Sequence, residues 1–228
     1  MIKLENLSKN YNGGKANEVK ALKNINLSIQ KGEMLAIVGA SGAGKSTLLH
    51  ILGGLSNITS GKYLFNGNDI GVLSESAKSK FRNQKIGIVM QSFALIDEYT
   101  VLQNVCIPLY FRKGVKDKQA LALNAIQKVG ISHLKDKVVS ELSGGEKQRC
   151  AIARCLCQNP EVILADEPTG QLDSENAKKI LDILCGLNEM GITVIIVTHD
   201  EKTANRCKRI ITLSDGIIVC DSFNSPLQ

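Results

Sequence analysis

Residues 39–47 read Gly-Ala-Ser-Gly-Ala-Gly-Lys-Ser-Thr and match the phosphate-binding pattern G-x-x-x-x-G-K-[ST]. The apolar run 34–38 before this motif predicts a buried strand, and residues 46–52 predict a helix after it. A strand, this loop and a helix in succession are the setting that the motif requires. The motif therefore indicates an α/β fold, in which ligands bind at the carboxyl ends of the strands.

The residue types in this loop each contribute to binding phosphate. Glycines let the backbone turn tightly with its N–H groups facing inward, and the N-terminus of the following helix adds positive potential. Lys45 can reach the β- and γ-phosphates of a nucleoside triphosphate, and the Ser46 hydroxyl can ligate Mg²⁺. A glycine-rich turn without a ligand is the alternative, which the flanking strand and helix disfavour. The expected phosphate-binding residues are Gly39, Ser41, Gly42, Gly44, Lys45, Ser46 and Thr47.

A second apolar run, 162–165, is followed by two carboxylates, Asp166 and Glu167. Carboxylates at the end of a strand lie at the ligand-binding edge of an α/β sheet. We expect Asp166 to hold Mg²⁺, directly or through water, and Glu167 to polarise the water that attacks the γ-phosphate. Two exposed loop acids before Pro168 are the alternative interpretation.

Residues 142–149 read Leu-Ser-Gly-Gly-Glu-Lys-Gln-Arg. Ser143 and Glu146 have the spacing of a capping box, which predicts a helix N-terminus with free, outward-facing N–H groups. This segment resembles the LSGGQ or LSGGE signature of the ABC-transporter ATPases, and five motifs of that family occur in the same order along nearly the whole chain. The resemblance implies that Ser143, Gly144, Gly145 and Glu146 complete the ATP site of a second subunit. An ordinary helix start with a Gly-Gly hinge is the alternative.

The same resemblance assigns two residues at strand ends. Gln91 follows the predicted strand 86–90 and corresponds to the glutamine that senses Mg²⁺ and the attacking water. His199 follows the predicted strand 193–197 and corresponds to the histidine that contacts the γ-phosphate and orients Glu167. The other two histidines have no motif around them and are interpreted as structural or solvated.

Two further assignments complete the set. Tyr11, in a predicted turn over residues 9–14, corresponds to the aromatic residue that stacks on adenine; an exposed tyrosine without a role is the alternative. Asp173 lies in the D-loop, where Gln171 stands in place of the usual asparagine. The resemblance thus implies ATP and Mg²⁺ as cofactors. The residues expected in catalysis are Lys45, Gln91, Glu167 and His199, and those expected at the metal are Ser46, Gln91 and Asp166.

Composition narrows the classes of function. The net charge of +6 over 228 residues is mild and unclustered, so no nucleic-acid partner is expected. The 7 cysteines include no C-x-x-C pair and predict buried, reduced thiols instead of a zinc site or a disulfide framework. No apolar run reaches the length of a membrane span, so any transport across a bilayer needs a partner.

The order of the elements predicts one domain over residues 1–228. Its expected fold class is α/β: a P-loop NTPase with a RecA-like core of mostly parallel strands, an antiparallel β subdomain and a helical subdomain. Residues 1–90 and 160–220 form the core with the antiparallel strands, and residues 91–159 form the helical subdomain with the signature. Strands are expected at 2–7, 25–29, 34–38, 62–66, 86–90, 161–166, 193–198, 208–213 and 217–220. Helices are expected after the phosphate loop and at 75–83, 101–110, 117–129, 143–157, 174–189 and 200–206.

A single domain without a coiled-coil insertion fits a transporter subunit better than the soluble ABC switches that act on ribosomes or DNA. The expected partners are a second ATPase subunit, in the simplest case an identical chain, and an integral-membrane permease that docks on residues 92–101. Residues 52–55, 91–96 and 165–174 are similar to the branch of lipoprotein-releasing, macrolide-efflux and antimicrobial-peptide-resistance ATPases. The expected location is the cytoplasm, on the inner face of the membrane. A soluble switch in cell division, translation or DNA maintenance stays the alternative.

Overall fold

A computed structural model describes residues 1–15 and 17–224 of the protein. Its central sheet has the strand order β10-β9-β3-β8-β7-β6, and all neighbouring strands are parallel except the β9–β10 hairpin. The strands of this sheet are β3 (Met34–Val38), β6 (Ile86–Val89), β7 (Val162–Asp166), β8 (Thr193–Val197), β9 (Arg209–Ser214) and β10 (Ile217–Phe223).

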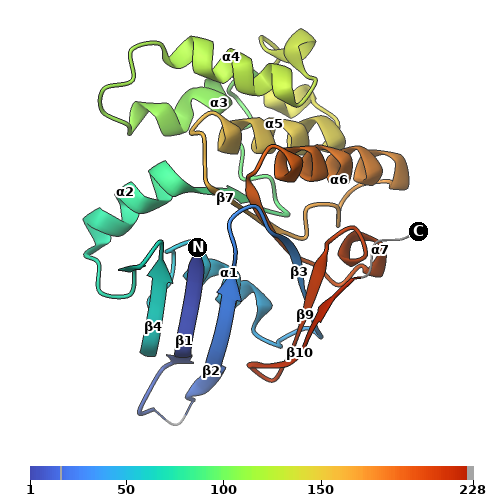
Figure 1. Cartoon of the computed structure of the whole chain (residues 1–228). Helices are drawn as coiled ribbons and strands as arrows, with labels where there is room; N and C mark the ends of the chain where they lie inside the picture. The colour runs from blue at the N-terminus through green and yellow to red at the C-terminus, as the bar shows by residue number, and fades with distance from the viewer. Residues whose placement is uncertain (16, 225–228) are drawn as a thin grey trace.

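A second, antiparallel sheet has the order β2-β1-β4-β5. Figure 1 shows its strands at the opposite end of the molecule from helices α3, α4 and α5. The strands are β1 (Ile2–Tyr11), β2 (Val19–Ile29), β4 (Ser60–Phe65) and β5 (Asn68–Asp69). The helices are α1 (Lys45–Leu52), α2 (Glu75–Lys85), α3 (Val101–Tyr110), α4 (Lys118–Lys128), α5 (Gly144–Leu156), α6 (Ser174–Glu189) and α7 (Glu201–Ala204), with 3-10 turns at Ser132–Leu134 and Val139–Glu141.

The central strands are continuous apolar runs because both faces of their sheet are covered. In β3, Leu35 and Ile37 join a buried cluster with α1 and the antiparallel sheet, whereas Met34 and Ala36 join a second cluster with α3, α4, α5 and α6. Side chains of β7 and β8 alternate between the same two clusters. The parallel sheet therefore lies between two cores. Its carboxyl edge, where β3, β7 and β8 end, stays available for a ligand.

Every predicted strand and helix is present, and so are the predicted mostly parallel sheet, the antiparallel sheet and the group of helices. The largest difference lies in the first hairpin, where β1 continues to Tyr11 and pairs it with Val19 of β2. The prediction that Tyr11 lies in a turn was therefore wrong. Polar residues follow Leu7 in β1, so the apolar alternation that marks a strand stops early. The strand continues through register shifts near Asn6 and Asn24, which adopt left-handed conformations.

The division into a core and a helical subdomain stays a prediction, although α3, α4 and α5 pack on one another within residues 91–159. In the part of the chain that the structure describes, no helix has the length and apolarity needed to cross a bilayer.

The cysteines are all free, and most of them are buried. Burial raises the pKa of Cys150, Cys157 and Cys207 to about 12. Cys185 is half-buried and Cys220, on β10, is exposed. The prediction of buried thiols was therefore wrong for Cys220.

Arg209, buried at the start of β9, ties three strands and the loop before β3 together. Its guanidinium donates two 2.6 Å hydrogen bonds to the Asp221 carboxylate, one of 2.7 Å to Glu33 and one of 2.9 Å to the Ser28 carbonyl. The paired guanidinium lowers the pKa of Asp221. This network joins the edge of the parallel sheet to β2 of the antiparallel sheet.

Replacing Arg209 with methionine is expected to lower the free energy of unfolding by about 3 kcal/mol, because the largely buried Glu33 carboxylate loses its cationic partner. The matched control is Arg206→Met, which removes an exposed pair with Asp182 and should change stability by less than about 1 kcal/mol. Urea unfolding followed by circular dichroism measures both. Equal losses in the two variants would contradict a structural role for the network.

Candidate functional site

The phosphate loop connects β3 to α1 where the two sheets approach each other. A Cβ atom at Gly39 would lie 2.2 Å from the carbonyl oxygen of Leu213 in β9, and one at Gly44 would lie 2.6 Å from that of Ala21 in β2. Both glycines also have positive φ angles, 148° and 103°. Contact with neighbouring backbone thus requires glycine at these positions, in addition to any contact with phosphate.

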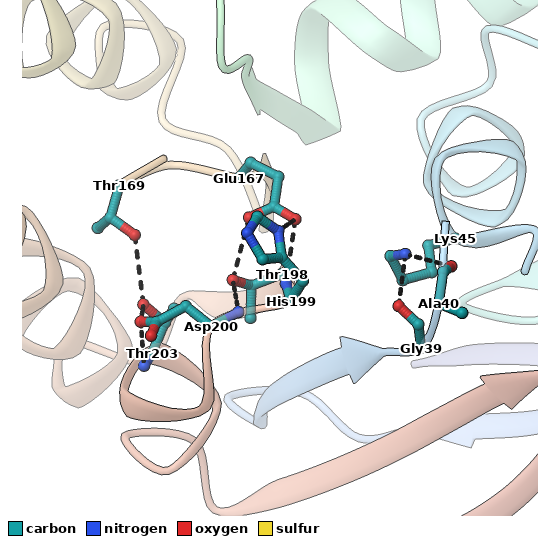
Figure 2. Close-up of polar contacts among 9 residues, drawn as sticks. All are labelled: Gly39, Ala40, Lys45, Glu167, Thr169, Thr198, His199, Asp200 and Thr203. Carbon is teal, nitrogen blue, oxygen red and sulfur yellow. Dashed lines mark hydrogen bonds and ion pairs between the residues drawn. The ribbon is translucent and has the colours of Figure 1, made fainter. Parts of the chain in front are cut away.

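Lys45 is the first residue of α1 and lies over the loop. Its ammonium group donates 2.8 Å hydrogen bonds to the carbonyl oxygens of Gly39 and Ala40 (Figure 2). No side chain caps α1 at Gly44, so the first N–H groups of the helix are left for a ligand. The loop therefore combines a flexible cation with free backbone N–H donors, and both groups bind phosphate.

Glu167 follows β7 and is held by the residues that follow β8. Its carboxylate accepts hydrogen bonds from the Thr198 hydroxyl at 3.1 Å and the His199 backbone N–H at 3.0 Å. The His199 Nδ1 atom lies 2.6 Å from the same carboxylate. Figure 2 shows the imidazole next to Glu167. The Glu167 side chain is 14% exposed and that of His199 is 74% exposed. The carboxylate is thus fixed in direction at the sheet edge, next to an imidazole that solvent can reach.

A pocket of about 510 Å³ brings most of the predicted site residues together. Burial, followed by the negative charge of Glu167, raises the pKa of Asp166, while His50, Lys45 and a hydrogen bond with Ser46 lower it. A cation beside Asp166 would therefore favour its ionised form. The predicted residues that line the pocket are Tyr11, Ser41, Gly42, Gly44, Lys45, Ser46, Thr47, Gln91, Asp166 and Glu167.

The donors predicted for Mg²⁺ are a hydroxyl, a carboxylate and an amide, from Ser46, Asp166 and Gln91. All three line this pocket. Within residues 1–15 and 17–224, no group of three or more His, Cys, Asp or Glu residues could hold a metal ion alone. This set fits Mg²⁺, which proteins usually bind through one or two carboxylates together with substrate phosphates and water.

The signature residues do not line this pocket; they form a separate cluster with the D-loop. Ser143 caps α5, and the capping box predicted with Glu146 is present. A Cβ at Gly144 would lie 3.3 Å from Leu172, and one at Gly145 would lie 2.5 Å from the side-chain oxygen of Asn176. Asp173, the N-cap of α6, accepts hydrogen bonds from Asn176. The signature and the D-loop thus form one surface of the same chain.

Sequence reasoning missed two residues that organise the Glu167 site. Thr198 is fully buried, donates to Glu167 and accepts the backbone N–H of Asp200 at 3.0 Å. Asp200 caps α7 through the backbone N–H and hydroxyl of Thr203. The available signal was the polar triplet 198–200 directly after a β-branched strand, in which only His199 was assigned a role.

Comparison with known proteins decides the family. A model of the family described as ABC transporter matches residues 22–170. The chain belongs to this family. As an ABC cassette it binds and hydrolyses ATP with Mg²⁺, and the matched segment contains the phosphate loop, the signature and Glu167.

Similar ABC proteins match the chain over all or nearly all of its length. It is 47% identical to the lipoprotein-releasing system ATP-binding protein LolD of Coxiella burnetii, over 97% of this chain and 96% of that protein. It is also similar to the ATP-binding cassette MJ0796 in a dimeric post-hydrolysis state with ADP and Pi, at a TM-score of 0.90 and 40% identity. A second dimeric structure of MJ0796, a bacterial ABC transporter cassette, has a TM-score of 0.90 and 41% identity. Both structures cover 100% of each chain.

The capping box at the ABC signature predicts how the stability of the protein depends on pH. Hydrogen bonds from the backbone and hydroxyl of Ser143 lower the pKa of Glu146 from its ordinary 4.5. Because the folded pKa lies below the unfolded one, ionised Glu146 stabilises the fold above about pH 4.5, and this contribution is lost as the pH falls through the lowered pKa. Glu146→Gln should therefore unfold more easily by about 1 kcal/mol at pH 7.

Urea unfolding at several pH values measures this difference, which should shrink only below pH 4.5. The control is Glu175→Gln, which removes an exposed acid from the first turn of α6. A difference between wild type and Glu146→Gln that stays constant down to pH 3.5 or so would contradict the assigned role.

Proposed function

We propose that the chain is the ATPase subunit that drives a separate membrane permease, and that it works as a dimer enclosing two ATP molecules. The observation that carries the mechanism is the Glu167 carboxylate, oriented by Thr198 and His199 at the sheet edge on the same pocket as Lys45. A general base needs both a fixed direction and access to water, and this arrangement supplies both.

In the proposed reaction, water attacks the γ-phosphate in line with the leaving oxygen. Glu167 accepts a proton from that water, and His199 and Gln91 position the water and the γ-phosphate. Lys45 and the backbone N–H groups of the phosphate loop offset the negative charge that develops on the phosphate oxygens. Mg²⁺, held by Ser46, Asp166 and Gln91, would add further positive charge at these oxygens.

The second half of each site is assigned to a partner chain. Ser143, Gly144 and Gly145 lie at the N-terminus of α5, away from the pocket of their own chain. Such a helix start attracts phosphate, and its one carboxylate, Glu146, is engaged by Ser143, so it suits the completion of a site whose base comes from elsewhere. The two dimeric structures of MJ0796 support an arrangement in which two copies face each other.

The permease is proposed to dock on residues 92–101. Ile96 and Tyr99 in this segment are 39% and 44% exposed, although both are large and apolar. The 47% identity with LolD favours lipoprotein release as the transport activity, within the branch that includes macrolide efflux and antimicrobial-peptide resistance. The proposed location is accordingly the cytoplasmic face of the membrane.

Glu167→Gln is expected to bind ATP normally and to hydrolyse it at least about 100-fold more slowly, because the amide cannot accept the proton. Phosphate release and binding of a fluorescent ATP analogue measure the two properties. Glu161→Gln, which removes an acid just before β7 that pairs with Lys85, is the matched control and should keep the normal rate. Normal turnover in Glu167→Gln would refute the assignment of the base.

The solution mass of Glu167→Gln tests the dimer. We expect a monomer without nucleotide and a dimer with Mg-ATP, because slow hydrolysis preserves the closed state. Lys45→Ala, which should not bind ATP tightly, is expected to stay monomeric under both conditions. A monomer of Glu167→Gln with Mg-ATP bound would contradict the identical-chain dimer. Co-purification of the chain with nucleic acid instead of a membrane protein would contradict the proposal that its partner is a permease.

A further inference from the structure

The loop from β6 to α3, which brings Gln91 into the pocket, contains two consecutive left-handed residues. Phe93 has a φ of 59° and Ala94 a φ of 51°. Neither residue type favours this conformation, because the Cβ atom crowds the backbone. At several other left-handed positions the chain uses asparagine, which tolerates the conformation; these are Asn6, Asn12, Asn24, Asn66 and Asn159. A strained pair such as Phe93-Ala94 persists only where its surroundings hold it.

Arg154, on the signature helix α5, supplies that hold. Its guanidinium donates one hydrogen bond of 2.5 Å to the Ala94 carbonyl and another of 3.0 Å to the Phe93 carbonyl. The two acceptors belong to the two strained residues themselves. The planar, charged guanidinium group can donate hydrogen bonds to two neighbouring oxygen atoms at once. Arg154 is half-buried, so solvent competes less for these bonds.

The following part of the loop is fixed to the same helical block. Asn104 of α3 is fully buried; it accepts the Ile96 backbone N–H at 2.8 Å and donates to the Ile96 carbonyl at 2.9 Å. The Phe93 ring also approaches the signature, since a Cβ at Gly144 would lie 4.0 Å from its tip. Residues 93–96 are therefore attached to the helices, and only the short link 90–92 separates them from β6.

Gln91, in that link, is placed close to the Glu167 side of the pocket. A Cβ at Gly170 would lie 3.2 Å from the Gln91 amide nitrogen and 3.6 Å from the Glu167 Cβ. With the loop fixed from residue 93 onward, the position of the Phe93-Ala94 turn decides how far the Gln91 side chain reaches. A change of about 1 Å at such a point can alter a reaction rate about 100-fold.

We propose that Arg154 is a positioning residue for ATP hydrolysis: by holding the left-handed Phe93-Ala94 turn against α5, it sets the place of Gln91 in the nucleotide pocket. The inference rests on the proposed function of Gln91 and concerns a residue that lies outside the pocket. Because the signature begins α5 and Arg154 lies in the last turn of the same helix, a movement of α5 would be transmitted through Arg154 to the Phe93-Ala94 turn.

The test compares Arg154→Met with Arg112→Met. Arg112 also donates to a backbone carbonyl, that of Gln158, but among the described residues it makes no hydrogen bond to the loop. Arg154→Met should lower kcat about 10- to 100-fold, raise the Mg²⁺ concentration for half-maximal rate, and leave the Kd for ATP within about twofold. Amide hydrogen exchange of residues 91–98 should become faster in Arg154→Met, and Arg112→Met should match the wild type in all of these measurements.

A second substitution separates positioning from general support of the fold. Ala94 is exposed, and asparagine there favours the left-handed conformation without help from Arg154. The double variant Arg154→Met, Ala94→Asn should recover at least about threefold in kcat and slow the exchange of residues 91–98. Arg154→Lys, a single-point donor, should fall between wild type and methionine.

The proposal is overturned if Arg154→Met keeps the wild-type kcat and exchange. It is equally overturned if its defect comes with faster exchange throughout α5 and no recovery by Ala94→Asn. If the wild-type chain itself hydrolyses no ATP, the proposed function fails, whereas the exchange of residues 91–98 still decides whether Arg154 holds the turn.

Discussion

The contact between the phosphate loop and the two sheets is the constraint on which the rest of the site depends. At Gly39 the loop backbone touches β9 of the parallel sheet, and at Gly44 it touches β2 of the antiparallel sheet. No side chain fits at either point, so the loop conformation is determined by the packing of the sheets. Lys45, Ser46 and the start of α1 then acquire their positions from the loop. Arg209 joins the two sheets at the other end of the same strands, since its hydrogen bonds connect the start of β9 to β10 and to Ser28 of β2.

The functional residues fall into two groups with different structural support. The first group lies at the carboxyl edge of the parallel sheet, where Asp166 ends β7 and is paired with β8, while Glu167 and His199 follow these two strands. The second group, Ser143 to Glu146, begins a helix that packs on other helices. The Phe93-Ala94 turn lies between Gln91, which lines the pocket, and the helices of the second group. Side-chain contacts couple the pocket of a chain to its own signature helix, and they include two hydrogen bonds of Arg154 to this turn and one of Gln148 to the Pro168 carbonyl.

Much of this site could be predicted from local sequence, because the residues that act together in each motif lie close together in the chain. The phosphate loop, the carboxylates after an apolar run and the Ser143–Glu146 capping box each involve residues within a few positions of one another. The remaining features depend on contacts between distant parts of the chain. Thr198 reaches Glu167 only because β7 and β8 are parallel neighbours, and Tyr11 belongs to a strand only because β2 pairs with it. The left-handed turn was unpredictable for the same reason, since phenylalanine and alanine carry no local signal for that conformation.

The uneven burial of the thiols has a practical consequence for observing the protein at work. Thiolates, and not thiols, react with maleimides, and burial both shields a cysteine and suppresses its ionisation. Cys220 is the exposed cysteine, whereas Cys185 is half-buried and the others are enclosed. A fluorophore can thus be attached preferentially at β10 of the natural chain, without first removing cysteines from its core. That strand lies at the edge of the parallel sheet and is tied to β9 by Asp221 and Arg209, so the native sequence already contains an attachment point for following movements of this sheet by energy transfer.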